Sequence, residues 1–173
     1  GTGSSSESGN GTSGEEKECY DKTKGITISV SSSDKNNATL IAFDKAKAKG
    51  KVVIPDTITI DGTVYTITAV GKNAFKGNTK ITSVKMGNKV KSIGTNAFYN
   101  YYISIKEVHI SSLSSWLNIQ FENVWSNPLR SAGCLYLDGQ LVTSVIIPDE
   151  ITKIGNYAFY NCNSITSVVI HNG

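Results

Sequence analysis

The sequence has few of the residue types from which catalytic and metal sites are built. Its 173 residues include two histidines and three cysteines. Neither His109 nor His171 lies in a metal-binding spacing such as H-E-x-x-H. Cys19, Cys134 and Cys162 form no CxxC pair and no zinc spacing, and their odd number argues against a disulfide framework. No G-x-S-x-G elbow, phosphate-binding glycine loop or Ca²⁺ loop is present. We therefore expect a protein that is not an enzyme and has no metal or cofactor.

Long apolar runs and a strong excess of charge are absent as well. No apolar run approaches the roughly 20 residues that span a bilayer. The 17 basic residues barely exceed the 14 acidic ones, and Lys and Arg are not gathered around aromatic residues along the chain. We therefore expect no nucleic-acid partner. The nearest basic run is "KAKAKGK" (45–51), where alternation would place four lysines on one side of an extended, solvated edge.

The first residues, "GTGSSSESGNGTSGEEKE", contain no large apolar side chain. Such a segment cannot bury a face, so residues 1–20 are expected to form a flexible tether. A tether ahead of a domain fits a secreted or cell-surface protein, or the separation of two domains. The chain begins without Met, which leaves room for an upstream segment that carries a lipid or cell-wall anchor.

One six-residue phrase occurs three times, as "VGKNAF" (70–75), "IGTNAF" (93–98) and "IGNYAF" (154–159). A second pattern, apolar-x-x-apolar-x-apolar, occurs in "ITSVKM" (81–86), "IKEVHI" (105–110), "VTSVII" (142–147) and "ITSVVI" (165–170). Equivalent residues of several neighbouring units are 23 or 24 positions apart: Gly71 and Gly94, Met86 and Ile110, and Ile147 and Ile170. A fixed period in the twenties is typical of a solenoid, in which each turn is one supersecondary unit.

Alternation within the second pattern predicts short strands with Val84 and Met86 pointing inward and Lys85 outward. The repeated phrase would form the returning side of each turn. Its glycines, Gly71, Gly94 and Gly155, are expected either in a backbone conformation closed to other residues or at a point too tight for a Cβ. Its phenylalanines, Phe75, Phe98 and Phe159, are expected to form one buried stack.

The segment "IPDEITKIGNYAFYNCNSITSVVI" (147–170) resembles the BspA-like, or Treponema pallidum type, leucine-rich repeat. It matches nearly every defined position of I-P-x-x-V-x-x-I-G-x-x-A-F-x-x-C-x-x-L-x-x-I-x-I, and the resemblance covers roughly residues 50–173. It implies a right-handed solenoid with a short parallel sheet of about five strands and irregular or short-helical returns. Those strands would be centred near Val53, Lys85, His109, Ile146 and Val169. Asn78 replaces Cys162 in the first unit, which argues for a space-filling cysteine rather than a thiol paired with His109.

Other segments depart from the repeat. "ITIDGTVYTIT" (58–68) and "CLYLDGQLV" (134–142) predict two inserted Asp-Gly hairpins. The second hairpin belongs to a variant repeat at 111–141, which also predicts a short Ser-capped helix and two tryptophans that serve either the core or exposed recognition. "GITISV" (25–30) and "ATLIAF" (38–43) predict an antiparallel pair that caps the coil. The expected domains are the tether (1–20), an N-terminal β cap (21–50) and the repeats (51–173).

Family members are described as adhesins toward host matrix proteins or other cells, so the resemblance implies a non-catalytic protein-binding module. A structural spacer in a larger surface protein, or an enzyme or inhibitor domain on a repeat scaffold, remain alternatives. The register places eight residues in two outward columns: Lys85, His109, Ile146 and Val169; Ser83, Glu107, Ser144 and Ser167. A protein partner would use Ile146 and Val169 as apolar anchors, unless a neighbouring repeat or hairpin covers them. The open edge after Ile170 predicts self-association or further repeats.

Overall fold

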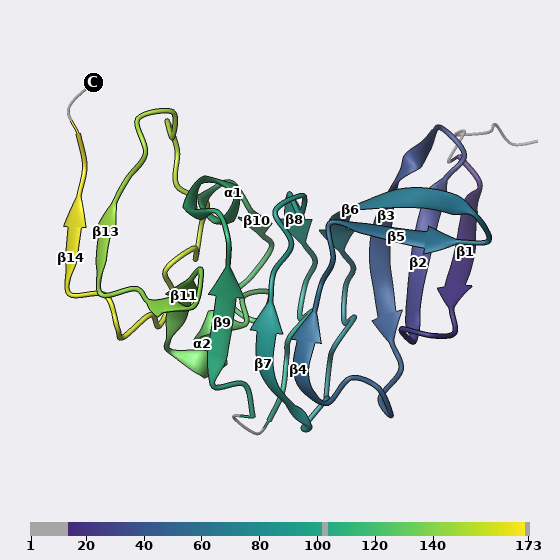
Figure 1. Cartoon of the computed structure of the whole chain (residues 1–173), viewed down its shortest axis with the longest axis horizontal. Helices are drawn as coiled ribbons and strands as arrows, with labels where there is room; N and C mark the ends of the chain where they lie inside the picture. The colour runs from purple at the N-terminus through teal and green to yellow at the C-terminus, as the bar shows by residue number, and fades with distance from the viewer. Residues whose placement is uncertain (1–13, 102–103, 172–173) are drawn as a thin grey trace, which may run out of the picture.

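The computed structural model describes residues 14–101 and 104–171; residues 1–13, 102–103 and 172–173 lie outside this description. The chain forms a mostly β solenoid, as expected. In Figure 1 the N-terminal strands lie at one end of the coil and β13 and β14 at the other, with β4, β7 and β9 side by side between them. Two sheets run along the coil: a ladder sheet on one side and a return sheet on the other.

The N-terminal end is an antiparallel meander of β1 (Glu16–Asp21), β2 (Ile26–Ser31) and β3 (Asp34–Phe43). Alternation places Ile26, Ile28 and Val30 inward, each at most 6% exposed. The expected antiparallel pair is therefore confirmed. Strand β1 was not expected: it occupies residues 16–20 of the predicted tether, while residues 1–13 lie outside the described residues.

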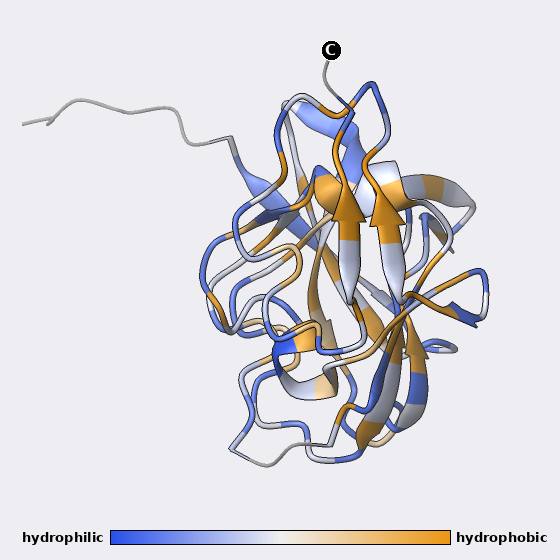
Figure 2. Ribbon diagram, turned by 90° about the vertical axis from the view of Figure 1, so that its left-hand side faces the viewer, coloured by the Kyte–Doolittle hydropathy of each residue, from blue (hydrophilic) through white to orange (hydrophobic). Residues whose placement is uncertain are grey.

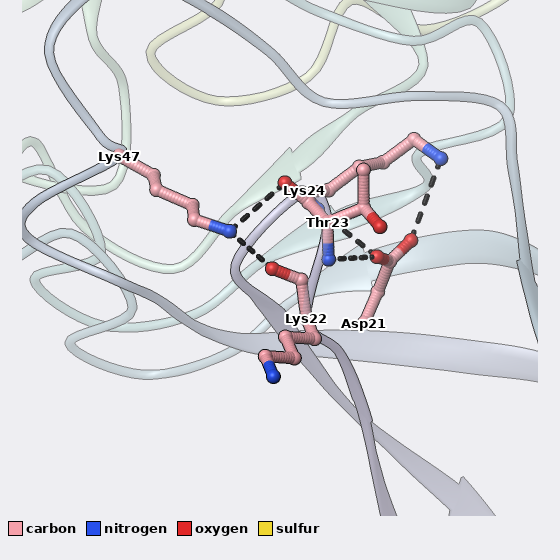
Figure 3. A network of polar contacts seen from close by, with 5 residues as sticks. All are labelled: Asp21, Lys22, Thr23, Lys24 and Lys47. Atoms are coloured by element: carbon pink, nitrogen blue, oxygen red, sulfur yellow. Dashed lines mark hydrogen bonds and ion pairs between the residues drawn. The ribbon is translucent and has the colours of Figure 1, made fainter.

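The lysine run does not form the expected extended edge. Residues 45–48 form a turn and a bend instead, and this turn folds back on the β1–β2 connection (Figure 3). The Lys47 ammonium donates hydrogen bonds to the carbonyl oxygens of Lys22 and Thr23. The Asp21 carboxylate accepts from the backbone N–H groups of Thr23 and Lys24 at 2.8 and 2.9 Å. Lys47 thus ties the turn at 45–48 to the β1–β2 connection of the cap, instead of lying on a solvated strand edge.

The ladder sheet contains four parallel strands, one per turn of the coil. They are β4 (Gly50–Val53), β7 (Ile81–Lys85), β9 (Glu107–Ile110) and β11 (Leu135–Leu137). Val52, Val84, Val108 and Leu135 lie opposite one another, and each is at most 3% exposed. The register of the apolar-x-x-apolar-x-apolar pattern is therefore confirmed for these turns.

The ladder is interrupted after β11, which the sequence did not predict. The strand expected beside β9 was 144–146, but Leu135–Leu137 takes that place. The Asp138-Gly139 turn then sends β12 (Gln140–Leu141) back antiparallel along the free edge of β11. Strand β13 (Ser144–Ile146) consequently pairs only with β14 (Ser167–Val169), in a separate two-stranded sheet.

The return sheet continues from the cap through β6 (Thr63–Val70) to β8 (Ser92–Ile93) and β10 (Gln120–Phe121). Strand β5 (Thr57–Ile60) pairs antiparallel with β6, which confirms the first hairpin. Helix α1 (Leu113–Leu117) begins after Ser112, whose hydroxyl accepts from the Ser115 N–H at 3.1 Å. Helix α2 (Leu129–Ala132) ends at Gly133, which has the left-handed φ of 69°.

The glycines of the repeated phrase lie at points of close approach between turns. A Cβ on Gly94 would lie 2.6 Å from the backbone nitrogen of Lys72, and one on Gly155 would lie 2.3 Å from the carbonyl oxygen of Ile119. Within the three copies of the phrase, the residues with a left-handed backbone are Asn73, Asn96 and Tyr157, with φ of 60°, 58° and 65°. Of the two expectations for the glycines, the steric one therefore holds for Gly94 and Gly155. At Gly71 the closest atom to an added Cβ would be a methyl carbon of Ile41 at 3.3 Å, so the restriction there is weaker.

The phenylalanine stack is shorter than expected. Phe75 and Phe98 stack with ring centroids 4.9 Å apart and planes 7° apart. Phe159 does not join them, because the variant repeat lies between. There Trp116 fills the core, 1% exposed, and its indole N–H donates to the Ala158 carbonyl at 2.9 Å.

Candidate functional site

The outward face of the ladder is the first part of the expected binding surface. Register pairs place Val53, Lys85, His109 and Tyr136 in one column across four strands. The His109 ring stacks on Tyr136 with centroids 4.8 Å apart, and its Nε2 lies 2.9 Å from a Glu107 carboxylate oxygen. Lys85, Glu107 and His109 are therefore brought together on neighbouring strands, and one face of the His109 ring is covered by Tyr136.

Ser83 differs from the expectation, because it is only 5% exposed. It lies between Lys51 on β4 and Glu107 on β9 in the adjacent column. Both neighbours have longer side chains, which shield the small hydroxyl from solvent. Ser83 therefore contributes to the floor of the face rather than to its rim.

A hollow of about 280 Å³ lies over this face. Lys51, Val53, Lys85, His109 and Asp138 are among the residues that line it. Asp138 comes from the β11–β12 turn, so the inserted hairpin closes one end of the hollow. The lining combines an apolar residue, Val53, with both signs of charge, from Lys51, Lys85 and Asp138.

The second part of the expected surface lies on the β13–β14 sheet. Ile146 and Val169 lie opposite each other and are 60% and 45% exposed. The hydroxyls of Ser144 and Ser167 are hydrogen-bonded at 2.8 Å. Figure 2 shows the two strands side by side at the C-terminal end of the coil, with hydrophobic residues in their C-terminal halves. The eight residues thus form two patches, separated by the break after β11.

Strand β14 also exposes side chains that the repeat pattern assigns to the core. Val168 pairs with the buried Val145 but is 48% exposed, and Ile170 is 67% exposed. The reason is position, because β14 is the last strand of its sheet. Within residues 14–101 and 104–171 no repeat or hairpin buries Ile146 or Val169.

The sequence prediction missed two residues of the ladder face, Val53 and Tyr136. Val53 is 51% exposed at the first strand, and Tyr136 carries the ring on which His109 stacks. The signal for Tyr136 was the triplet Leu135-Tyr136-Leu137, whose apolar-x-apolar alternation matches that of the other ladder strands. The sequence prediction assigned this triplet to a hairpin only. In the structure it is both an arm of that hairpin and a strand of the ladder.

Chemistry-bearing groups are dispersed. In residues 14–101 and 104–171, no group of three or more His, Cys, Asp or Glu side chains is placed to hold a metal ion. Burial raises the pKa of the Cys162 thiol, which disfavours the nucleophilic thiolate. The Cys162 sulfur lies 3.7 Å from the Ser164 hydroxyl, whereas His109 contacts Glu107. Neither described helix is long and apolar enough to cross a membrane.

Comparison of the sequence with models of protein families identifies the repeats that form the coil. A family model described as the BspA type leucine rich repeat region matches residues 42–127 and 134–173, in six copies. The chain belongs to the BspA-type leucine-rich repeat family. The gap in the match, residues 128–133, covers helix α2 of the variant repeat. No curated protein matches the chain.

One solved structure with a TM-score above 0.5 shares the fold of this BspA-type chain, and two others are similar at lower scores. A leucine rich cell surface protein from Faecalibacterium prausnitzii is 20% identical with a TM-score of 0.52; the match covers 90% of this chain and 43% of that one. The chain therefore spans less than half of that relative. A T. pallidum leucine rich repeat protein is 22% identical with a TM-score of 0.43, covering 87% of this chain and 71% of that one. A leucine-rich repeat protein from Bacteroides capillosus is 18% identical with a TM-score of 0.44, covering 86% and 96%.

Proposed function

We propose that this chain is a non-catalytic, adhesin-like protein-binding module of a cell-surface or secreted protein. The observation that carries the proposal is the exposed apolar pair of Ile146 and Val169 beside the ladder face. Aliphatic side chains that are 60% and 45% exposed on neighbouring strands are the kind of surface that a protein partner buries. Membership of a repeat family that commonly serves as a protein-interaction module supports it.

The partner contacts both patches. Ile146 and Val169 act as apolar anchors on the β13–β14 sheet, and burial of each would contribute about 1 to 2 kcal/mol. Lys85, Glu107 and His109 form a polar rim on the ladder, where charge sets orientation and association rate more than affinity. The rigid parallel ladder holds these groups at fixed spacing, so binding orders few side chains.

The surface location is part of the proposal. It is supported by the description of the Faecalibacterium relative as a cell surface protein and by a Gly/Ser-rich N-terminal segment of tether composition. A host extracellular-matrix protein is the proposed class of partner. Anchoring would come from a lipid or cell-wall signal upstream of residue 1.

The test is binding to a panel of purified extracellular-matrix proteins, with the Ile146→Ser/Val169→Ser double variant beside the unchanged chain. The matched control is Val64→Ser, which removes a valine that is 57% exposed on the β5–β6 hairpin. We expect the double variant to bind at least tenfold more weakly and the control to bind normally. Equal affinity of the folded double variant would refute this face as the site.

Two other functions compete. A structural spacer predicts no binding to any matrix protein, while the fold remains intact. An enzyme or inhibitor domain requires an acid, base or nucleophile constellation or an inserted reactive loop. The dispersed titratable groups of the described residues argue against the enzyme, and the exposed pair of Ile146 and Val169 favours the binding module over the spacer.

We further propose that the chain self-associates through β14 when no further repeat covers it. The two terminal edges differ in charge: β1 carries Glu16, Lys17, Glu18 and Asp21, whereas β14 carries no charged residue. Charged edge strands resist edge-to-edge pairing and uncharged ones permit it. Sedimentation at increasing concentration should show dimers that Val168→Lys abolishes; a monomer at all concentrations would refute this.

A further inference from the structure

A second surface lies on the Ala-Phe turns, which stack on one another because the Phe75 N–H donates to the Ala97 carbonyl and the Phe98 N–H donates to the Trp125 carbonyl. Aromatic rings from successive turns meet there. Tyr99 packs edge-on against Trp125, with centroids 4.6 Å apart, and against Tyr101 at 5.1 Å. Tyr157 and Tyr160 form a further edge-on pair on the last turn, at 6.1 Å. We call these five rings the aromatic stripe.

Cations lie directly on the aromatic stripe. The Arg130 guanidinium carbon is 3.2 Å from the centroid of the Trp125 ring, and the Lys76 ammonium is 5.7 Å from that of Tyr99. The Arg130 carbonyl accepts a hydrogen bond from the Asn161 amide at 2.8 Å, which ties this turn to the last one. Stacking on a ring holds a cation in place while its charge remains available to a ligand.

The turns that carry the stripe contain no acidic residue. Residues 72–80, 95–101, 125–132 and 156–163 include no Asp or Glu, although the whole chain has 14. The nearest acid in the sequence is Glu122, whose carboxylate already accepts from the Thr95 N–H at 2.7 Å and from its hydroxyl at 2.5 Å. The stripe therefore presents positive charge and ring surface together, in contrast to the mixed charges of the ladder face.

Exposure indicates that the outer rings are available. Tyr101 is 82% exposed, Tyr160 is 43% exposed and Tyr157 is 40% exposed. Three large side chains in one region that remain in contact with water suggest a ligand surface rather than part of the core. Trp116, by contrast, is 1% exposed, so the two tryptophans of the variant repeat serve different purposes.

We propose that the aromatic stripe binds a linear acidic polysaccharide that bears carboxylate or sulfate groups. Its acidic groups would meet Lys76 and Arg130, its C–H faces would lie against the tyrosine rings, and its hydroxyls would meet exposed asparagine amides such as Asn73 and Asn156. Charge complementarity with an acid-free surface selects a polyanion. This site is separate from the proposed protein-binding face and does not depend on it.

The geometry favours a polysaccharide over two other polyanions. Single-stranded nucleic acid is bound along a positively charged groove that follows its backbone, whereas here the two cations on the stripe lie against rings and Arg130 occupies one face of Trp125. A protein interface has a contiguous, fully desolvated apolar centre, whereas these rings form two separate groups, Tyr101–Tyr99–Trp125 and Tyr157–Tyr160, whose outer members are exposed. Rings beside amides and cations suit a hydroxylated, acidic chain.

The test measures binding of size-fractionated heparin to the whole chain by calorimetry at physiological salt. The variants are Lys76→Ser, which removes one positive charge, and the double variant Tyr101→Ser/Tyr160→Ser, which leaves the charge of the protein unchanged. Matched controls are Lys89→Ser, an exposed lysine in the loop after β7, and Tyr20→Ser, a tyrosine that is 47% exposed on the cap. Circular dichroism verifies the fold of each variant.

We expect the tyrosine double variant to bind heparin about tenfold more weakly and Lys76→Ser to bind several-fold more weakly, with both controls unchanged. Desulfated heparin then distinguishes sulfate from carboxylate recognition. Equal losses for Lys76→Ser and Lys89→Ser, with no loss for the tyrosine variant, would show charge attraction only and overturn the proposal. Tighter binding of poly-glutamate or oligo-dT than of heparin, with the same dependence on the tyrosines, would overturn it in favour of an acidic protein or a nucleic acid.

Discussion

Removing one ring of the Phe75–Phe98 stack tests the packing of the coil. Phe98 is 3% exposed and Phe75 is 4% exposed, and their rings are nearly parallel, with centroids 4.9 Å apart. Phe98→Ala removes a buried aromatic side chain and leaves a cavity between two turns. Such substitutions cost about 3–5 kcal/mol in the free energy of unfolding. The lost ring–ring contact accounts for about 0.5–1.5 kcal/mol of it.

The assay is urea unfolding followed by circular dichroism, with the slopes compared before the midpoints are interpreted. For a chain of this size, a loss of 3–5 kcal/mol lowers the melting temperature by about 6–20 °C. The matched control is Phe159→Ala, because Phe159 occupies the same position of the phrase but is only half-buried and outside the stack. We expect it to cost less than about 2 kcal/mol. A loss below about 1 kcal/mol for Phe98→Ala, or a larger loss for Phe159→Ala, would refute the stack.

Three other changes follow from the turns. Gly94→Ala would place a Cβ 2.6 Å from rigid backbone and should cost about 1–3 kcal/mol of unfolding free energy in urea; an unchanged midpoint would contradict the close approach. Tyr157 has a left-handed φ of 65°, which asparagine adopts more easily than tyrosine. Tyr157→Asn should therefore raise the free energy of unfolding in urea by about 1 kcal/mol. A lower unfolding midpoint would contradict this. Hydrogen bonds from the Thr95 side chain and backbone lower the pKa of Glu122 below its ordinary value of 4.5. Its contribution to stability is therefore present above pH 4.5 and lost as the pH falls through the lower folded value; Thr95→Val should raise that pKa in an NMR titration, and an unchanged pKa would count against the contact.

Much of the coil could be predicted because its constraints are local and repeated. Parallel strands that stack at one per turn require the same inward positions in each turn, so the apolar-x-x-apolar-x-apolar pattern shows the register directly. Val84 and Val108 are both fully buried and lie opposite each other. The short helix was predictable for the same reason, because a serine cap acts within three residues.

The break in the ladder was not predictable from alternation. A hairpin arm and a ladder strand have the same two-residue period, so Leu135–Leu137 reads equally well as either. Only the position of β9 in the folded coil decides that this segment pairs in parallel on one edge and with Gln140–Leu141 on the other. The left-handed conformation of Asn96 was not predicted, because glycine is the residue that adopts it at least cost and Gly94 lies two positions earlier.

The aromatic stripe was not predicted from the sequence, because most of its residues are far apart along the chain. Lys76 and Tyr99 are 23 residues apart, and Trp125 is 26 residues after Tyr99, so no local window contains them together. A repeat of nearly constant length nevertheless places such residues side by side, one turn above another. Arg130 follows Trp125 by only five residues, whereas Lys76 and Tyr99 come together only through the repeat, so neighbouring residues in sequence account for one of these cation–ring contacts and not for the other. A search for lysine and arginine near aromatic residues at a spacing of one repeat would have found Lys76 over Tyr99. In this fold, equivalent residues of successive turns form columns. Packing of the core constrains the inward columns, which leaves the outward columns free to vary with the proposed ligands.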